Sequence, residues 1–444
     1  MDAPRAAVDD RSTKFCIVGA GSSGLAAARA FAAAGIPFDC LEREDDVGGN
    51  WYYGRPHSSV YASTHLISSK RLTEYLDFPM PDDFPPFPHH RQVWEYLRAY
   101  ARRFALYERI EFGTPIERIE READDRRGAW RVALVDGRVR RYRGIVVANG
   151  HNWDPRYPEF SGTFAGTALH SSQYKTPDVL ADRRVLVVGG GNSGCDIACE
   201  SGGVAARTFI SLRRGYHFLP KFWRGRPLDA LNERLLRRGV PLTVRRWLGQ
   251  LVERISFGPA GSYGLPTPDH RLFETHPIIN QQLFYQVAHG RVTPKPDVAE
   301  LCGREVRFVD GTREPIDVVV YATGFRISFP FMDPAELNWR DGRPRLFLNV
   351  FHPEADDLFV VGLIQPDSGQ FGLVDRQSRL AAAFVKACES GTPAAERFRR
   401  RKRAEVDAPL GAGIRYVDSP RHALEVEHFS YAERLQRLLA EFSR

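Results

Sequence analysis

Short apolar runs that end in glycine-rich turns occur twice along the chain, and each is followed by a segment of helical character. Residues 15–18 (FCIV) lead into GAGSSG at 19–24, and residues 185–188 (VLVV) lead into GGGNSG at 189–194. In a GxGxxG turn the first glycine permits a tight bend, the second admits a pyrophosphate, and the third lets the helix pack on the strand. The pattern predicts an α/β fold with two Rossmann-like dinucleotide-binding domains.

The residues that follow each turn indicate which dinucleotide it binds. After the first turn we expect a helix over 25–34, and the next strand ends in Glu42, 18 residues past Gly24. That is the spacing of an acid that binds a ribose diol. After the second turn the corresponding strand ends in Arg213 and Arg214, whose guanidinium groups suit a 2′-phosphate. The second turn is therefore predicted to bind NADPH, with a solvated strand end as the alternative.

A repeated hairpin pattern closes each predicted unit. An Asp-Gly pair at 136–137 and another at 310–311 stand between strand-like runs, which is a strong hairpin signal. Each hairpin leads to an apolar strand that ends near a glycine, Gly150 or Gly324, and we expect both glycines to approach a cofactor. Enough chain follows Gly324 to complete the first domain, so the second domain is predicted to be inserted into the first. The predicted divisions are 1–157 (first domain, first part), 158–325 (second domain, with a helical insertion at about 215–290) and 326–444 (first domain, second part, and C-terminal helices).

Composition narrows the class of protein without identifying a ligand. The 444 residues are 43% hydrophobic and 26% charged, with a formal net charge of +7, which is ordinary for a globular enzyme. Because no long apolar stretch, signal-peptide pattern or CxxC pair occurs, we expect a cytoplasmic enzyme with no metal and no membrane contact. The basic run at 399–403 is expected to be the solvated end of a helix that begins near Gln377, not a nucleic-acid-binding surface.

The segment between the two units resembles a family fingerprint. Residues 164–174 (FAGTALHSSQY) fit FxGxxxHxxx(Y/F/W), the fingerprint of class B flavin monooxygenases, and the final tyrosine is similar to the flavin-containing monooxygenase branch. Baeyer–Villiger enzymes usually end this motif with tryptophan. The resemblance covers nearly the whole chain. The other matching segments are GGNW at 48–51, FPMPDDFP at 78–85, HPIIN at 276–280, ATGF at 322–325 and GLIQP at 362–366.

The resemblance implies an NADPH-dependent monooxygenase with FAD in the outer domain and NADP(H) in the inserted one. In such enzymes NADPH reduces the flavin and molecular oxygen adds to give a C4a-hydroperoxyflavin. An amine nitrogen or a sulfide sulfur of a small molecule then takes the distal oxygen. A Baeyer–Villiger or N-hydroxylating enzyme of the same class is the alternative. The oligomeric state stays open, with a homodimer as one option.

The motifs also imply which residues form the site. His170 and Tyr174 are expected in the hinge between the domains, with a purely structural histidine as the alternative. Gln365 and Asp367 are candidates for the flavin or substrate edge, with Asp367 as a general base. The residues expected at FAD are Gly19, Gly21, Ser23, Gly24, Glu42, Arg43, Gly49, Asn50, Trp51, Ser68, Gly150 and Gln365. The residues expected at NADP(H) are Gly191, Asn192, Ser193, Gly194, Ser211, Arg213, Arg214 and Gly324.

One position departs from the family pattern. In the flavin-containing branch, the segment that resembles residues 66–70 (LISSK) carries an asparagine where this chain has Ile67, and the asparagine amide stands over the flavin. Ile67 offers no hydrogen-bond donor, and the loss of one such bond costs about 1–3 kcal/mol. Three outcomes stay open: Ser68 or Ser69 replaces the amide, the enzyme releases hydrogen peroxide as an NADPH oxidase, or the chemistry has shifted.

Overall fold

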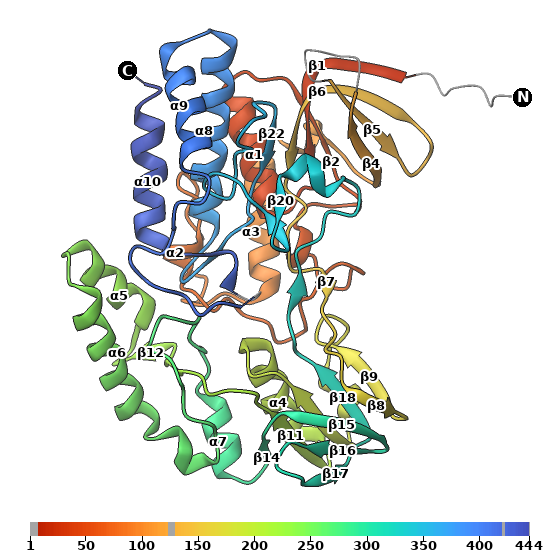
Figure 1. Ribbon diagram of the computed structural model, residues 1–444, viewed down its shortest axis with the longest axis vertical. Helices are drawn as coiled ribbons and strands as arrows, with labels where there is room; N and C mark the ends of the chain where they lie inside the picture. Colours follow the sequence, from red (N-terminus) through yellow and green to blue (C-terminus); the bar gives the residue numbers. More distant parts are fainter. Residues whose placement is uncertain (1–7, 123–128, 420–421, 444) are drawn as a thin grey trace, which may run out of the picture.

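The computed structural model describes residues 8–122, 129–419 and 422–443. It has two lobes stacked along its long axis, one built from both ends of the chain and the other from its middle (Figure 1). Each lobe contains a sheet whose central strands are parallel and apolar, as expected of strands that are covered on both faces.

The sheet of the first lobe has the strand order β3-β2-β1-β6-β5-β4, and β22 pairs with β6 as well. Ile17 at its centre lies between Cys40 and Val146 of the neighbouring parallel strands, and all three are fully buried. The strands are β1 (Val8–Val18), β2 (Phe38–Leu41), β3 (Ile110–Glu111), β4 (Ile116–Arg121), β5 (Trp130–Leu134), β6 (Val139–Val147) and β22 (Leu358–Val360).

The second lobe holds a parallel sheet of order β14-β11-β10-β18-β9 and a smaller sheet of order β17-β16-β15-β8. Val187 of β10 pairs with Ile210 of β11 on one side and with Val320 of β18 on the other. The strands are β8 (Ser161–Phe164), β9 (Thr167–His170), β10 (Arg184–Val188), β11 (Arg207–Ser211), β14 (Val292–Lys295), β15 (Val298–Gly303), β16 (Glu305–Phe308), β17 (Arg313–Pro315) and β18 (Val318–Tyr321).

The chain leaves the first lobe once and returns to it once. On the way out it forms β7 (Asp154–Pro155), on the way back β19 (Phe325–Arg326), and these two short strands pair antiparallel. The later strand β22 then joins β6 in parallel, which completes the first sheet. This topology confirms the predicted fold class of two Rossmann-like units with the second inserted into the first. The residue numbers of the domain boundaries stay predictions.

Helices cover the first sheet, and α1 packs against α8 with α10 beside them (Figure 1). Buried alanines of α1, such as Ala26 and Ala27, let this helix approach its neighbours closely. The helices of this lobe are α1 (Ser22–Ala33), α2 (Lys70–Thr73), α3 (His90–Arg103), α8 (Phe371–Glu389), α9 (Pro393–Ala404) and α10 (His428–Ala440).

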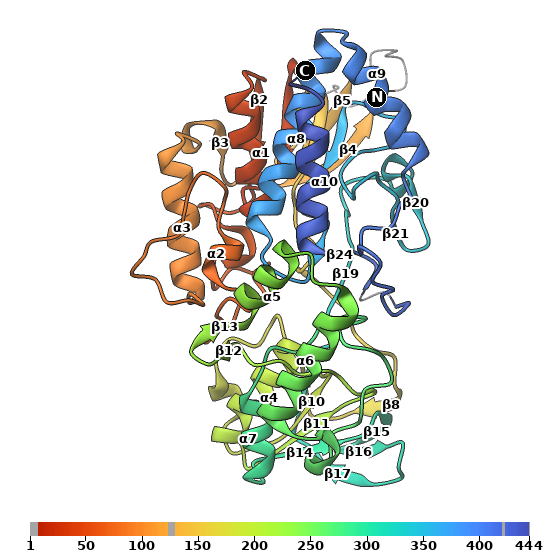
Figure 2. The same ribbon diagram turned by 90° about the vertical axis from the view of Figure 1, so that its left-hand side faces the viewer.

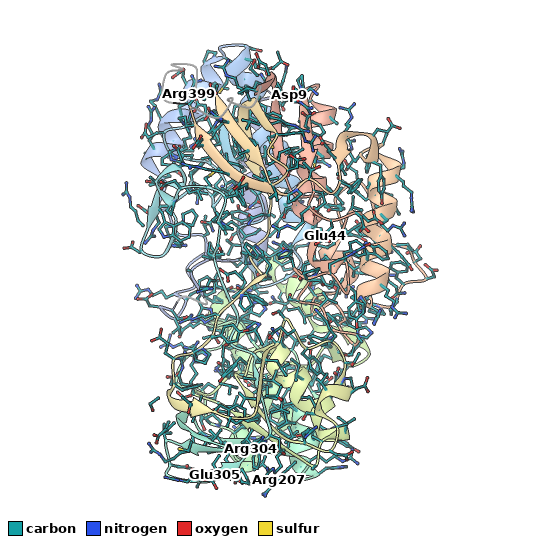
Figure 3. All side chains as sticks on the ribbon, turned by 90° about the vertical axis from the view of Figure 1, so that its right-hand side faces the viewer. Asp9, Glu44, Arg207, Arg304, Glu305 and Arg399 are labelled. Carbon is teal, nitrogen blue, oxygen red and sulfur yellow. The ribbon has the colours of Figure 1, made fainter. Side chains whose placement is uncertain are left out.

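The basic run at 399–403 lies in α9, a helix separate from α8, so the expectation of one helix beginning near Gln377 is wrong. Arg399 lies at the far end of the first lobe (Figure 3) and pairs with Asp356 at 2.5 Å. Lys402 is buried, and its ammonium donates to the carbonyl oxygens of His352 and Ala355 at 2.9 and 2.7 Å. Arg399 and Lys402 of this run therefore bind acceptor groups of the protein itself.

Further helices belong to the second lobe. In Figure 2, α5 lies between α6 and the lower end of α10, where the two lobes meet. Within the described residues no helix combines the length and the apolar character of a membrane span. The helices are α4 (Asn192–Val204), α5 (Leu228–Arg237), α6 (Leu242–Phe257) and α7 (Gln282–Ala288). The remaining short strands are β12 (Phe222–Trp223), β13 (Arg226–Pro227), β20 (Trp339–Arg340), β21 (Arg343–Pro344), β23 (Gln365–Pro366) and β24 (Glu425–Val426).

Candidate functional site

The first glycine turn joins β1 to α1 in a geometry that only glycine tolerates. Gly19 has a φ of +95°, and a Cβ on Gly24 would lie 1.8 Å from the carbonyl oxygen of Gly19. Gly21 is the N-cap of α1 and supplies no side-chain cap. The N–H groups of the first helical turn are therefore open to a phosphate, as a dinucleotide pyrophosphate requires.

A cavity of about 210 Å³ lies against this turn, and most of the residues predicted for FAD line it. The predicted residues in its wall are Gly19, Gly21, Ser23, Glu42, Arg43, Gly49, Asn50, Trp51 and Gly150. Gly24 is absent from the wall because it packs beneath the turn, and Ser68 and Gln365 are absent from it too. Figure 3 labels Glu44, another wall residue, on the side of the first lobe that faces the second.

Sequence reasoning missed part of this wall. Gln370 lines the cavity, and its amide nitrogen donates to the carbonyl oxygen of Gly362 at 3.3 Å. Trp153 and His57 also line it, with their rings in an edge-on contact at 5.9 Å. The proximity of Gln370 to the GLIQP segment is a usable signal for it in the sequence. Nothing in the sequence pattern brings His57 and Trp153 together.

Glu42 is buried at the end of β2 with its carboxylate in the cavity wall. It accepts hydrogen bonds from the backbone N–H groups of Ala20 at 2.5 Å and Glu44 at 3.0 Å. Burial raises the pKa of Glu42, and these backbone bonds act in the opposite direction. A carboxylate has further lone pairs beyond those two bonds, so Glu42 can still accept from ribose hydroxyls.

The second glycine turn repeats the geometry between β10 and α4. Gly189 has a φ of +112°, and a Cβ on Gly194 would lie 1.9 Å from its carbonyl oxygen. Gly191 is the N-cap of α4, again without a side-chain cap. The amide oxygen of Asn192 accepts from the backbone N–H of Ile279 at 2.9 Å, so Asn192 fixes the HPIIN segment beside the turn. Ser193 is exposed at the start of α4.

The residues predicted to bind phosphate near the second turn differ in whether their side chains already have hydrogen-bond partners. Arg213 is exposed, and the half-buried Arg214 has a buried Nε with no hydrogen-bond partner. A phosphate would provide the acceptor that this Nε lacks. Ser211 is buried, and its hydroxyl already donates to the carbonyl oxygen of Pro296 at 2.8 Å. The two arginines therefore fit a 2′-phosphate better than Ser211 does.

His170, the last residue of β9, and Tyr174 in the core of the second lobe are fully buried and do not line the cavity. The Nε2 of His170 lies 3.0 Å from the carbonyl oxygen of Gly324, and burial lowers the pKa of this imidazole. The hydroxyl of Tyr174 donates to the carboxylate of Glu200, and burial raises the pKa of the Tyr174 hydroxyl. His170 thus contacts the return crossing at Gly324, whereas Tyr174 bonds to α4 and its ring contacts Tyr61 of the first lobe. These contacts are compatible with the hinge role and unlike those of a proton donor to substrate.

The segment with Ile67 and Ser68 lies where α5 meets the first lobe. Ile67 is 40% exposed, and the hydroxyl of Ser68 contacts that of Thr73 at 2.9 Å. The backbone N–H of Ser69, which is the N-cap of α2, donates to the Asp229 carboxylate of α5 at 2.5 Å. This segment is thus held by the second lobe and not by the FAD cavity wall.

Gln365 and Asp367 lie beside β24 in a group of acidic residues. The amide of Gln365 donates to Glu425 at 3.1 Å, and the Oδ1 of Asp367 accepts from the backbone N–H of His428 at 2.9 Å. Burial, and then the nearby charge of Glu427, raise the pKa of Asp367 to about 7. A carboxyl group with that pKa changes its charge near neutral pH, which suits acid–base or ligand-binding work.

Metal ligation finds no support in the described part of the chain. Over residues 8–122, 129–419 and 422–443, no three His, Cys, Asp or Glu side chains gather in a way that could hold a metal ion. The six cysteines form no disulfide in the part of the chain that the structure describes, and four of them are buried.

Known proteins are similar to this chain over most of its length. The family model described as flavin-binding monooxygenase-like matches residues 12–440. Flavin-containing monooxygenase 1 of Sus scrofa is 33% identical over 444 residues, which cover 95% of this chain and 82% of the relative. Flavin-containing monooxygenase 3 of Homo sapiens is 35% identical over 393 residues, 84% of this chain and 74% of the relative.

A solved structure shares the fold at lower identity. Cyclohexanone monooxygenase from Rhodococcus sp. Phi1 bound to NADP+ superposes with a TM-score of 0.69 at 18% identity, covering 99% of each chain. At this identity the match supports the two-lobed fold only.

Proposed function

Because the chain belongs to the flavin-binding monooxygenase-like family, whose members are FAD- and NADPH-dependent oxidoreductases, we propose that it oxygenates an amine nitrogen or a sulfide sulfur of a small molecule. For a sulfide the balanced reaction is R₂S + O₂ + NADPH + H⁺ → R₂SO + H₂O + NADP⁺. Sulfur is oxidised, one oxygen atom is transferred to it, and the other leaves as water.

The observation that carries this proposal is the pair of glycine turns, one in each lobe, with the same strict geometry. At Gly24 and at Gly194 an added Cβ would meet a backbone oxygen within 2 Å, so neither turn accepts another residue without a backbone shift. Two turns of this kind in one chain support simultaneous binding of two dinucleotides. Electron transfer from NADPH to a flavin requires that arrangement, and bound flavin supplies the redox and oxygen chemistry.

We propose that the cavity residues hold FAD, with the N-terminus of α1 at its pyrophosphate and Glu42 at a ribose. Correspondingly, the N-terminus of α4 would hold the NADP pyrophosphate, with Arg213 and Arg214 at the 2′-phosphate. The open N–H groups of both helices and the unpartnered Nε of Arg214 support this assignment. His170 and Tyr174 would position the lobes and would not transfer protons. A cytoplasmic location, the oligomeric state and the lack of nucleic-acid contact stay predictions.

Rapid mixing tests the oxygenase directly. The purified flavoprotein is reduced with NADPH without oxygen, mixed with oxygenated buffer, and followed through the flavin spectrum. We expect a transient band unlike that of either oxidised or reduced flavin, followed by oxygenated product when an amine or sulfide is present. Direct return to oxidised flavin with one hydrogen peroxide per NADPH, with and without an amine or sulfide, would contradict the proposal.

Ile67 favours a second candidate, an NADPH oxidase that releases hydrogen peroxide. Its exposed apolar side chain offers no hydrogen bond at the place where the resemblance implies an asparagine amide. Peroxide release in full proportion to NADPH, unchanged by amines and sulfides, would support this candidate. Conversion of a ketone to an ester or lactone would instead support Baeyer–Villiger chemistry.

A further inference from the structure

A segment of the first lobe, residues 58–63, inserts into the second lobe. Tyr61 is 6% exposed, and its ring packs in the hydrophobic core of the second lobe. The backbone N–H of Ala62 donates to the carbonyl oxygen of Lys175 at 2.8 Å, and the Lys175 ammonium donates to the carbonyl oxygen of Ser58 at 2.6 Å. The two lobes are therefore joined at this segment as well as at the two chain crossings.

Helix α4 presents two carboxylates to this segment. Asp196 and Glu200 stand four residues apart, so they share one face of the helix. The hydroxyl of Tyr61 donates to the Oδ2 of Asp196 at 2.8 Å, and that of Ser63 donates to Glu200. The other Asp196 oxygen accepts from the amide of Asn280 at 2.6 Å, so this side chain is fixed in place. We call Tyr61, Ser63, Asp196 and Glu200 the latch.

The latch lies between the two regions proposed to bind cofactors. On one side, Ser58 and Asn50 line the FAD cavity, and the Ser58 hydroxyl donates to the carbonyl oxygen of Asn50 at 2.7 Å. Two residues separate Ser58 from Tyr61 along the chain. On the other side, α4 begins at Asn192 with N–H groups open to a pyrophosphate, and Asp196 follows about one helical turn later. The latch therefore fixes the start of α4 relative to the FAD cavity.

We propose that Asp196 and Glu200 are positioning residues, which hold α4 against the first lobe so that the nicotinamide of NADPH meets the flavin. This inference rests on the proposed placement of NADP at α4. The reaction concerned is FAD + NADPH → FADH⁻ + NADP⁺, in which a hydride leaves NADPH with both bonding electrons and reduces the flavin. A displacement of about 1 Å between the reacting groups can slow such a transfer about a hundredfold. Neither carboxylate lines the FAD cavity, so both act through the position of the helix.

Removal of the two latch hydroxyls tests the proposal. Tyr61→Phe/Ser63→Ala keeps the buried ring, and each carboxylate keeps a partner within the second lobe, Asn280 or Tyr174. The flavoprotein is mixed with NADPH without oxygen, and we expect the rate constant of flavin reduction at saturating NADPH to fall at least about tenfold. Tyr61→Phe alone should produce most of this fall, since Ser63 is exposed and its bond competes with water. Tyr285→Phe, at a tyrosine of α7 that is 61% exposed, is the matched control and should keep the wild-type rate.

Two readouts without turnover separate positioning from binding. NADP⁺ is titrated into the oxidised holoenzyme and followed through the flavin difference spectrum. We expect the dissociation constant of the double variant to stay within about twofold of wild type, because the N-terminus of α4 is unchanged, and the amplitude to fall by about half or more. Reduction by dithionite, which needs no nicotinamide, should keep the wild-type rate. A wild-type rate of reduction by NADPH, a wild-type amplitude, tenfold weaker NADP⁺ binding or slower reduction by dithionite would each overturn the proposal.

Failure of this inference and failure of the proposed function give different results. If the double variant slows flavin reduction as expected but the wild type converts neither amines nor sulfides, the proposed function is wrong and the latch stands. If the wild type oxygenates amines or sulfides while the double variant is reduced by NADPH at the wild-type rate, the latch is wrong and the oxygenase stands.

Discussion

The backbone N–H of Ser69 donates a 2.5 Å hydrogen bond to the carboxylate of Asp229, 160 residues later in the chain. The bond ties the N-cap of α2 in the first lobe to α5 of the second, next to Ile67. Because Lys221 also donates to the carbonyl oxygen of Leu66, the second lobe holds this segment at two points.

Asp229→Ala should loosen the Ser69 segment. A hydrogen bond to a charged group contributes about 1.5–3 kcal/mol, so we expect exchange of the Ser69 amide to accelerate about ten- to hundredfold. Hydrogen-exchange mass spectrometry on peptides that contain Ser69 measures this. Asp229→Asn keeps an acceptor oxygen and should show a smaller effect. Exchange equal to wild type in both variants would mean that the bond does not hold the segment.

Ile67→Asn should reduce the release of hydrogen peroxide. The added amide can donate a hydrogen bond where Ile67 cannot, and one such bond is worth about 1–3 kcal/mol, or roughly a five- to hundredfold change in a rate of breakdown. The ratio of peroxide formed to NADPH consumed is the measurement. Since Ile67 is 40% exposed, the change should cost little stability. Ile67→Ala removes the same bulk without adding an amide, and a similar fall in peroxide there would contradict this explanation.

Gly194→Ala should abolish tight NADPH binding while flavin stays bound. The new Cβ would lie 1.9 Å from the carbonyl oxygen of Gly189, so the turn at the N-terminus of α4 must shift. We expect the KM for NADPH to rise more than tenfold, with an unchanged flavin-to-protein absorbance ratio. Gly203→Ala is the matched control in the same helix, because nothing lies within 4 Å of its added Cβ. It should leave the KM unchanged and stabilise α4 by up to about 1 kcal/mol.

Asp367→Asn should stabilise the protein at high pH and not at low pH. The folded-state pKa of Asp367, about 7, is above its ordinary value of 3.8 because of burial and then the charge of Glu427. The folded protein therefore binds this proton more tightly than the unfolded chain, and its stability falls as pH rises from about 4 to 7. A neutral amide avoids this loss, which is on the order of 2–4 kcal/mol.

Urea unfolding of the holoenzyme at pH 4.5 and pH 8 measures this difference. The free energy of unfolding of Asp367→Asn should exceed that of wild type at pH 8 by more than it does at pH 4.5. Asp83→Asn, in an exposed loop, should match wild type at both values. An equal effect of Asp367→Asn at the two pH values would show that the carboxyl group does not titrate in this range.

The local parts of the fold could be predicted from the sequence because their signals are local. Each GxGxxG turn requires glycine at specific bends, and both turns join a strand to a helix as predicted. The Asp-Gly pair at 310–311 lies between antiparallel strands, as its composition indicates. The first helix begins at Ser22 and not at 25, since residues of the turn itself already adopt helical geometry. Gly391 and Pro393 stand at the division between α8 and α9. The helical pattern resumes after them, so the sequence predicted a single helix.

The parts of the site that depend on distant contacts could not be predicted. The motif identifies His170, but its contact with the carbonyl oxygen of Gly324 joins residues 154 positions apart. The periodicity of α6 indicates an amphipathic helix and gives no sign that Arg245 is buried. Burial of a charged side chain depends on the packing of whole lobes, which composition and spacing do not encode.

The two chain crossings between the lobes form one paired ribbon, β7 with β19, which the ion pair of Arg326 with Asp154 at 2.9 Å reinforces. Hinge motions concentrate in a few residues between domains, so we expect this ribbon to be the place where the second lobe turns relative to the first.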